Sequence, residues 1–129
     1  MMSQIPEPTA PLLPAGRNDS VYATGSRIEL GAPSIARVVS GSPREGIVPL
    51  CTLGDTEIGI WELRTGTVTD VELDEVFVVL SGNATIEFLD EDRSLVVGAG
   101  DVVRLVAGSR TRWTVQDHIR KVSIARPAP

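Results

Sequence analysis

The stretch that decides the fold is GTVTDVELDEVFVVLSGNATIEFLDEDRSLVVGAGDVVRLVAGSRTRW, which runs from Gly66 to Trp113. It consists of short runs rich in Val and Ile, each ended by a turn that contains Gly, Asn or Asp. Such runs, separated by such turns, are typical of antiparallel strands in a small barrel. The stretch contains no histidine, and the only histidine of the chain, His118, lies beyond it.

The same pattern extends in both directions from this stretch. The sequence predicts strands at residues 56–63, 75–80, 84–89, 94–97, 102–106, 113–115 and 120–124, with weaker candidates at 26–30 and 36–39. No stretch of ten residues shows the period of an amphipathic helix. We therefore predict an all-β fold, an antiparallel β-barrel or jelly roll, formed by residues 21–129 as one domain.

Residues 1–20 differ in composition from the rest, because they contain Pro6, Pro8, Pro11 and Pro14. Prolines at this density oppose both helices and central strands, so we predict an extended, Pro-rich flexible arm. Two interpretations of the arm stay open. It is either a loose tail, which is common at chain termini and is the favoured interpretation, or a segment that lies across a partner subunit.

Composition excludes several functions for this chain of 129 residues. Its net charge is −5 and its pI is about 4.8, whereas nucleic-acid binding needs clustered cations, so we expect none. We also expect no signal peptide and no membrane span, and hence a cytoplasmic protein. Cys51 is the only cysteine, which excludes an intrachain disulfide and a Cys-based zinc site.

Two turns of the deciding stretch match the paired motifs of the cupin family, G-x5-H-x-H-x3-4-E-x6-G and G-x5-P-x-G-x2-H-x3-N. Glu75, followed after six residues by Gly82, matches the end of the first motif. Residues 100–108 match the start of the second, with Val106 at the position of the proline. The chain thus resembles cupins, and the resemblance implies their jelly-roll fold.

Cupins usually hold a metal on three histidines and one glutamate, and only the glutamate, Glu75, is present here. The histidine positions are taken by Glu72 and Asp74, by Thr69 and Val71 or by Val68 and Asp70 in the first motif, depending on the count, and by Thr111 in the second. Glu72 and Asp74 could offer oxygens to a hard cation, but alternation points Asp74 and Glu75 in opposite directions. We therefore expect no metal and no cofactor.

A narrower resemblance rests on Trp61-Glu62, Asp74-Glu75 and Trp113. These features are similar to small cupins grouped with the cupin domain of (S)-ureidoglycine aminohydrolase and with the ethanolamine-utilisation cupin. Most single-domain members of this group have no assigned activity, and the aminohydrolase uses a manganese site whose ligands are missing here. Cupins of this kind usually pair through edge strands, so the resemblance implies a homodimer.

The candidate ligand pocket follows from strand alternation, which points every second side chain inward. Starting from Glu75, Phe77 and Val79 point inward, and starting from Thr111, so do Trp113 and Val115. Trp61 and Glu62 lie on opposite faces, and the sequence does not decide which one faces the pocket. The candidate ligand-binding residues are Glu75, Phe77, Thr111, Trp113, Trp61 and Glu62. Such an apolar and aromatic cavity suits a small organic molecule.

Three roles stay open for Glu75. It is a nearly solitary metal ligand, a catalytic acid or base tuned by burial, or a structural residue paired with an arginine or a backbone amide. Our leading hypothesis is a small cupin that binds a small organic molecule without a histidine metal site. The alternative is a metal-independent enzyme acting on a small amide, ureide or carboxylate, with Glu75 as its tentative catalytic residue. A third is an accessory partner of a metabolic enzyme.

Overall fold

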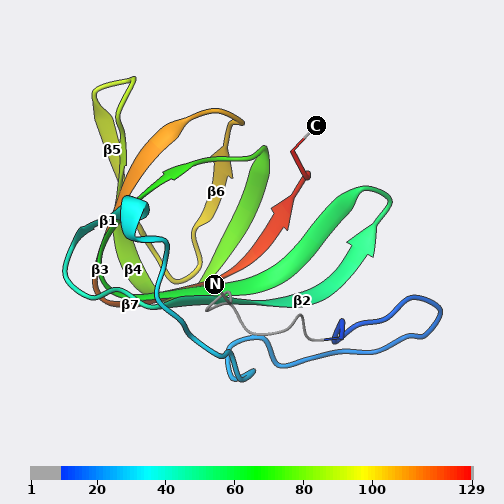
Figure 1. The fold of residues 1–129 in the computed structure, drawn as a ribbon. Coiled ribbons are helices and arrows are strands. Elements are labelled where there is room, and N and C mark those ends of the chain that lie inside the picture. Colours follow the sequence, from blue (N-terminus) through cyan, green and yellow to red (C-terminus); the bar gives the residue numbers. More distant parts are fainter. Residues whose placement is uncertain (1–9, 129) are drawn as a thin grey trace.

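The computed structural model describes residues 10–128 and shows an all-β protein (Figure 1). Among these residues the only helical segment is one short 3-10 turn, and no helix is long and apolar enough to cross a membrane. The elements are η1 (Ile35–Arg37), β1 (Val38–Ser40), β2 (Glu45–Leu53), β3 (Thr56–Val71), β4 (Glu75–Phe88), β5 (Arg93–Gly98), β6 (Val102–Leu105) and β7 (Arg110–Ala125). All strand pairs are antiparallel, which confirms the predicted fold class.

Three long strands form the centre of the sheet in the order β3-β7-β4. Each of them takes part in two half sheets. In the first, residues 57–64 of β3 pair with residues 118–125 of β7, and the sheet continues to β2 on one side and β6 on the other. In the second, residues 66–71 of β3 pair with residues 110–115 of β7, and β1 and β5 form the edges. The chain therefore folds as a bent antiparallel sandwich.

The bend in β4 depends on Gly82. Its φ of 75° lies in the region that favours glycine, and an added Cβ would overlap the backbone oxygen of His118 on β7. The pairing of β4 with β7 is interrupted at this point and then resumes at Thr85. The turn predicted after residue 80 is therefore a bend within one strand, because the hydrogen-bonded ladder continues on both sides of the glycine.

The predicted barrel is not closed. Within residues 10–128, β2 and β6 do not pair with each other, nor do β1 and β5. A closed barrel needs edge strands that can form a continuous ladder, but β1 has three residues and β6 has four. The sequence also missed β2, because Pro49 and the glycine before Ile47 interrupt its pattern. Pro49 is tolerated there because β2 is an edge strand with a bulge beside Pro49.

The two half sheets enclose one apolar core. Its buried members are Leu63, Val68, Phe77, Val79, Ala84, Ile86, Phe88, Val97, Val103, Leu105, Trp113, Val115 and Ile119. The core is mainly aliphatic, and its aromatic part lies where Phe77 and Trp113 pack against each other with ring centroids 5.7 Å apart. This aromatic part adjoins the cavity described below.

Part of the predicted arm is ordered on the domain. Residues 1–9 lie outside the described residues, but residues 10–15 run beside β2, where the blue segment is seen in Figure 1. The amides of Leu12 and Leu13 donate hydrogen bonds to the carbonyl oxygens of Pro49 and Leu50, at 3.2 and 2.8 Å. We call residues 10–15 the N-terminal strap.

Candidate functional site

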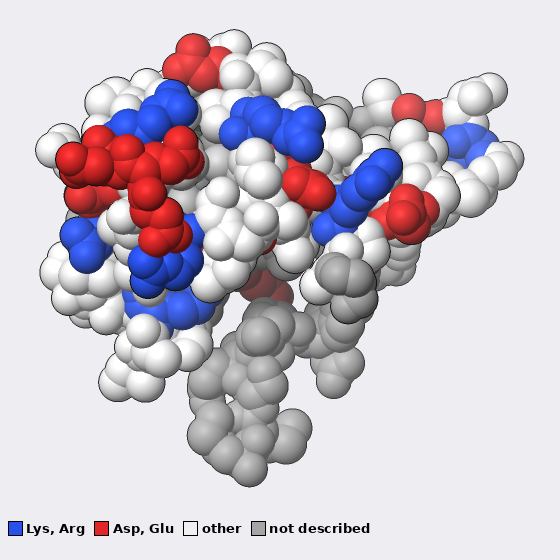
Figure 2. All heavy atoms as spheres, turned by 90° about the horizontal axis from the view of Figure 1, so that it is seen from above, with Lys and Arg blue, Asp and Glu red and all other residues white. Residues whose placement is uncertain are grey.

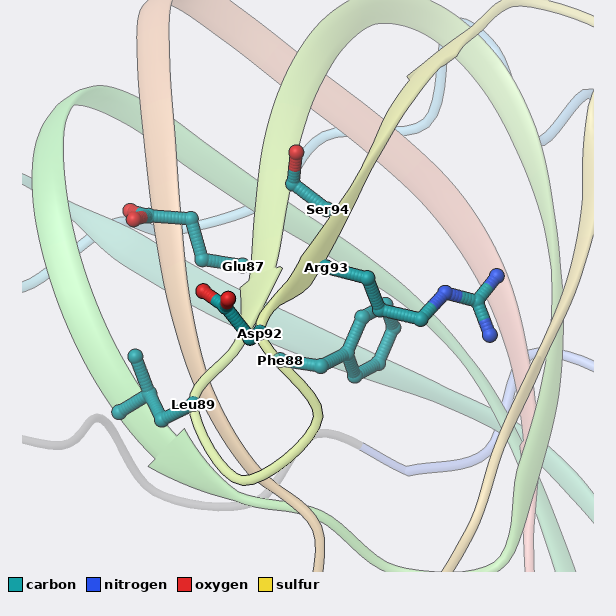
Figure 3. Close-up of a pocket in the computed structure, with 6 residues that line it drawn as sticks. All are labelled: Glu87, Phe88, Leu89, Asp92, Arg93 and Ser94. Atoms are coloured by element: carbon teal, nitrogen blue, oxygen red, sulfur yellow. The ribbon is translucent and has the colours of Figure 1, made fainter.

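Two hollows are candidates for a functional site. The smaller, of about 250 Å³, lies at the tip of the β4–β5 hairpin. Figure 3 shows Glu87 and Arg93 pointing away from each other there, and the Arg93 guanidinium lies 5.7 Å from the centre of the Phe88 ring. Most of its lining residues are exposed, and they include no group of buried polar side chains. We therefore assign the candidate site to the larger cavity.

The larger cavity has a volume of about 910 Å³ and is lined by both half sheets, since Lys121 belongs to the first and Val68 and Trp113 belong to the second. Side chains of β2, β3, β7 and the start of β4 form its wall, together with the β3–β4 turn, Arg37 of η1 and the N-terminal strap. Its apolar lining includes Leu13, Ile47, Ile58, Trp61, Val68 and Trp113. Its charged lining consists of Arg37, Glu57, Asp70, Glu72, Glu75 and Lys121.

A buried ion pair forms one part of the wall. The Lys121 ammonium on β7 lies 2.7 Å from Oε2 of Glu75 on β4, and both side chains are less than one-tenth exposed. The ammonium also lies over three aromatic rings, 4.2 Å from the centre of Phe77, 4.6 Å from Trp61 and 4.9 Å from Trp113. Burying a charge is costly unless it is paired. Here the carboxylate and the ring faces together compensate the ammonium.

Glu72 is a second buried carboxylate of the wall. One of its oxygens, Oε2, accepts hydrogen bonds from the Thr111 hydroxyl at 2.6 Å and from the Trp113 indole N–H at 3.0 Å. Burial raises the pKa of Glu72, although these two hydrogen bonds oppose the increase. Thr111 and Trp113 therefore act together to fix the orientation of this carboxylate.

Asp70 and Arg37 lie on the same side of the cavity. The Arg37 guanidinium donates two hydrogen bonds to the Glu45 carboxylate and one to the Thr69 carbonyl, and its Nη2 lies 4.0 Å from Asp70. Burial raises the pKa of Asp70 despite the charge of Arg37. Burial alone would lower the pKa of Arg37, but its bonds to Glu45 raise it. Arg37 is thus already paired within the protein.

The sequence-predicted site residues separate into three groups. Glu75, Trp61 and Trp113 line the cavity. Phe77 and Thr111 are fully buried behind it, where Phe77 contacts the Lys121 ammonium and Thr111 bonds to Glu72. Glu62 does not line the cavity, which decides the alternative left open for Trp61 and Glu62.

Glu62 has a structural partner on the other face of β3. Its Oε1 accepts a hydrogen bond from Arg120 at 2.7 Å, and Arg64 bonds to its other oxygen. Burial alone would raise the pKa of Glu62, but the hydrogen bonds from Arg120 and Arg64 lower it. Arg120 also donates to the carbonyl oxygens of Ala23 and Ser26, so this pair attaches the N-terminal segment to the sheet.

Lys121 is the functional side chain that sequence reasoning missed. Inward alternation from Thr111 through Trp113 and Val115, carried on along β7, reaches Ile119 and Lys121, and both are buried. Strand alternation in the sequence was therefore sufficient to indicate that Lys121 points inward. Likewise, inward alternation along β3 places Val68 and Asp70 on the cavity side, and Glu72, the first residue after β3, lines the same cavity.

The residues present do not fit the metal site that cupins usually carry. Of the three residue pairs that could stand at the histidine positions of the first motif, Val68 and Asp70 are the pair whose members both face the cavity on alternate positions of β3. Thr111 stands at the histidine position of the second motif and is buried. Within residues 10–128, no group of three or more His, Cys, Asp or Glu side chains is arranged to hold a metal ion. Oε2 of Glu75 is bonded to Lys121.

Charges on the outer surface are mixed. The face shown in Figure 2 carries acidic and basic side chains next to each other, without a continuous basic area. Neighbouring acidic and basic side chains on the surface form ion pairs, for example Arg110 with Asp90 and Arg112 with Glu87. The buried charged residues are Glu72, Glu75 and Lys121 of the cavity wall and the Glu62–Arg120 pair.

Comparison with known proteins places this fold and cavity in context. The EutQ-like cupin domain family matches residues 51–122. No curated protein matches the chain.

Several solved structures are similar in fold. The EutQ protein of Clostridium difficile has 20% sequence identity and a TM-score of 0.65, over 84% of this chain and 86% of that one. A putative ethanolamine utilization protein of Salmonella typhimurium has 20% identity and a TM-score of 0.59, over 76% and 80%. A cupin superfamily protein of Desulfitobacterium hafniense has 14% identity and a TM-score of 0.59, over 99% of both chains. Identities this low show a shared fold and nothing more.

Proposed function

The chain belongs to the EutQ-like cupin domain family, and from this premise we propose that it binds a small organic molecule in the larger cavity, without a metal held by histidines. The observation that carries this proposal is the buried polar set of the cavity wall. Lys121, Glu75 and Glu72 are each less than one-tenth exposed, and they line a cavity of about 910 Å³ together with Trp61 and Trp113. Small-molecule sites combine an apolar wall with a few oriented polar groups in this manner.

A cavity-filling substitution tests this proposal without changing any charge. Ser123 lines the cavity from β7, so Ser123→Trp places an indole inside it. Gln116→Trp is the matched control, because Gln116 is exposed on the same strand and does not line the cavity. We expect fragments that bind the wild-type protein, detected by saturation-transfer NMR, to bind the control and not Ser123→Trp. Equal binding to all three proteins would place the ligand elsewhere and refute the proposal.

A second candidate is a metal-independent enzyme acting on a small amide or ureide, as the expected resemblance to (S)-ureidoglycine aminohydrolase suggests. The observation that favours it is Glu72, whose raised pKa suits proton transfer and whose carboxyl lines the cavity. Glu75 is less suited to this role than the sequence implied, because Lys121 holds it. Ammonia release from ureides and amides tests this candidate. Turnover by the wild-type protein that is lost in Glu72→Gln would support it, and no turnover would refute it.

We also propose that the protein forms a homodimer through an edge of the sheet. The support is the end of β2 beyond the N-terminal strap, which bonds to this strand only at Pro49 and Leu50. Leu53 lies there, is 67% exposed and does not line the cavity. Exposed edge strands are usually covered. Light scattering after size exclusion tests this proposal. Leu53→Lys should convert a dimer to a monomer, and a monomeric wild-type protein would refute the proposal.

A further inference from the structure

The charged groups that line the larger cavity are unequal in sign. Four carboxylates line it, those of Glu57, Asp70, Glu72 and Glu75, but only two cations do. Both cations are already engaged within the protein. Lys121 is bonded to Glu75, and Arg37 is bonded to Glu45, which lies outside the lining. A ligand carboxylate would therefore meet excess negative charge and no free cation.

Glu72 supplies an independent observation, because it is only 6% exposed and half of its carboxylate lacks a partner. Its Oε2 accepts both hydrogen bonds, from Thr111 and Trp113, whereas no described residue donates to Oε1. Within residues 10–128, Arg112 Nε is the only fully buried side-chain polar atom without a partner, so Oε1 of Glu72 is open to the cavity and free to accept a hydrogen bond. A charged donor brought by a ligand can therefore bond to this oxygen.

The donor has to be organic rather than a metal ion. Within residues 10–128 the acidic side chains are not arranged as a metal-binding group. The same wall is also largely apolar, with Leu13, Ile58 and Trp61 facing the cavity. A molecule with a hydrocarbon body and a charged N–H donor satisfies both parts of the wall.

On the basis of the proposed function, we propose that the ligand is a small organic amine, bound as its ammonium ion, whose N–H group donates to Oε1 of Glu72 while Asp70 adds to the negative potential. Its hydrocarbon part lies against the apolar wall. Glu72 is then the residue that selects amines over alcohols and carboxylates of the same skeleton.

Three compounds with one skeleton test this inference: benzylamine, benzyl alcohol and benzoate. Their affinities for the wild-type protein are measured by saturation-transfer NMR titration and by isothermal calorimetry. We expect benzylamine to bind at least about tenfold more tightly than benzoate, a difference that one charge-assisted hydrogen bond provides. Glu72→Gln should weaken benzylamine about tenfold and leave benzyl alcohol unchanged.

Two controls keep the result interpretable. Glu29→Gln removes an exposed carboxylate that does not line the cavity, and it should leave all three affinities unchanged. Asp70→Asn is a second variant for the case in which Glu72→Gln does not fold, and it should weaken benzylamine selectively, to a smaller extent.

The outcomes distinguish this inference from the proposed function. If benzoate or benzyl alcohol binds as tightly as benzylamine, and Ser123→Trp abolishes that binding, the amine inference is wrong and the proposed function remains. If a panel of cationic, neutral and anionic fragments shows no cavity binding, both are wrong. A stoichiometric divalent cation in the wild-type protein that is lost in Glu72→Gln would also overturn the inference, because Glu72 would then bind a metal ion and not an amine.

Discussion

Replacing Lys121 by methionine tests the energetic basis of the cavity wall. The substitution keeps an unbranched side chain beside Trp61, Phe77 and Trp113 and removes the ammonium, so the Glu75 carboxylate loses its partner at 2.7 Å. Because the Glu75 side chain is only 9% exposed, water cannot replace that partner fully. Breaking a buried pair in this way costs about 3–5 kcal/mol.

We therefore expect Lys121→Met to lower the free energy of unfolding by about 3–4 kcal/mol. For a chain of 129 residues this corresponds to a fall in Tm of roughly 10–15 °C.

A double-mutant cycle separates the ion pair from simple loss of packing. Glu75→Gln combined with Lys121→Met removes both charges and should recover most of the stability, since neutral replacements of a buried pair are often as stable as the pair. Urea denaturation at pH 7 measures all four proteins. The reasoning is refuted if Lys121→Met lowers Tm by less than about 4 °C, or if the double variant is as unstable as the single one.

Three further predictions follow from other parts of the molecule. Glu72 has a raised pKa, so its contribution to stability is complete below the ordinary glutamate pKa and is lost as pH rises through the raised value. Glu72→Gln should therefore be more stable than the wild-type protein at pH 8 but not at pH 4. Equal pH profiles of the two proteins in thermal denaturation would contradict this prediction. Gly82→Ala should lower the free energy of unfolding by well over the roughly 1 kcal/mol expected for the control Gly54→Ala. Both glycines have a positive φ, but only Gly82 faces a backbone oxygen. Similar urea midpoints for the two variants would contradict this prediction. Deletion of residues 1–15 should speed the reaction of Cys51 with a thiol reagent, because the N-terminal strap and Cys51 line the same cavity. Deletion of residues 1–9 is the control and should leave the rate unchanged. An unchanged rate for the longer deletion would show that the strap does not shield the thiol.

Strand alternation predicted the interior of this protein better than it predicted strand ends. Counting from Glu75 and from Thr111 correctly placed Phe77 and Trp113 inside. The same rule failed at turns, because a glycine can bend a strand without ending it. Gly82 was taken as a break, yet β4 continues on both sides of it.

The missing part of the prediction concerns charged side chains. Lys121 is absent from the predicted site residues. Lysine is rarely buried without a partner, and the partner of Lys121, Glu75, is 46 residues away in sequence. Only the pairing of β4 with β7, in which residues of both strands come together, reveals the contact. Similarly, the sequence placed Glu72 at one possible histidine position but gave no means to link it to Thr111 and Trp113.

These contacts explain how the Glu75 carboxylate stays paired in a cupin fold that lacks the usual histidines and their metal ion. Glu75 is the one residue of the cupin metal set that this chain keeps, and a buried carboxylate needs a cation beside it. Lys121 provides that cation from within the chain, at 2.7 Å, and the three rings around its ammonium favour a positive charge at this point. Because the pair is neutral as a whole, it does not set the charge that a ligand meets. The other carboxylates that line the cavity, those of Glu57, Asp70 and Glu72, would set that charge instead, and for this reason the charge of the proposed ligand is the property of this cavity most worth measuring first.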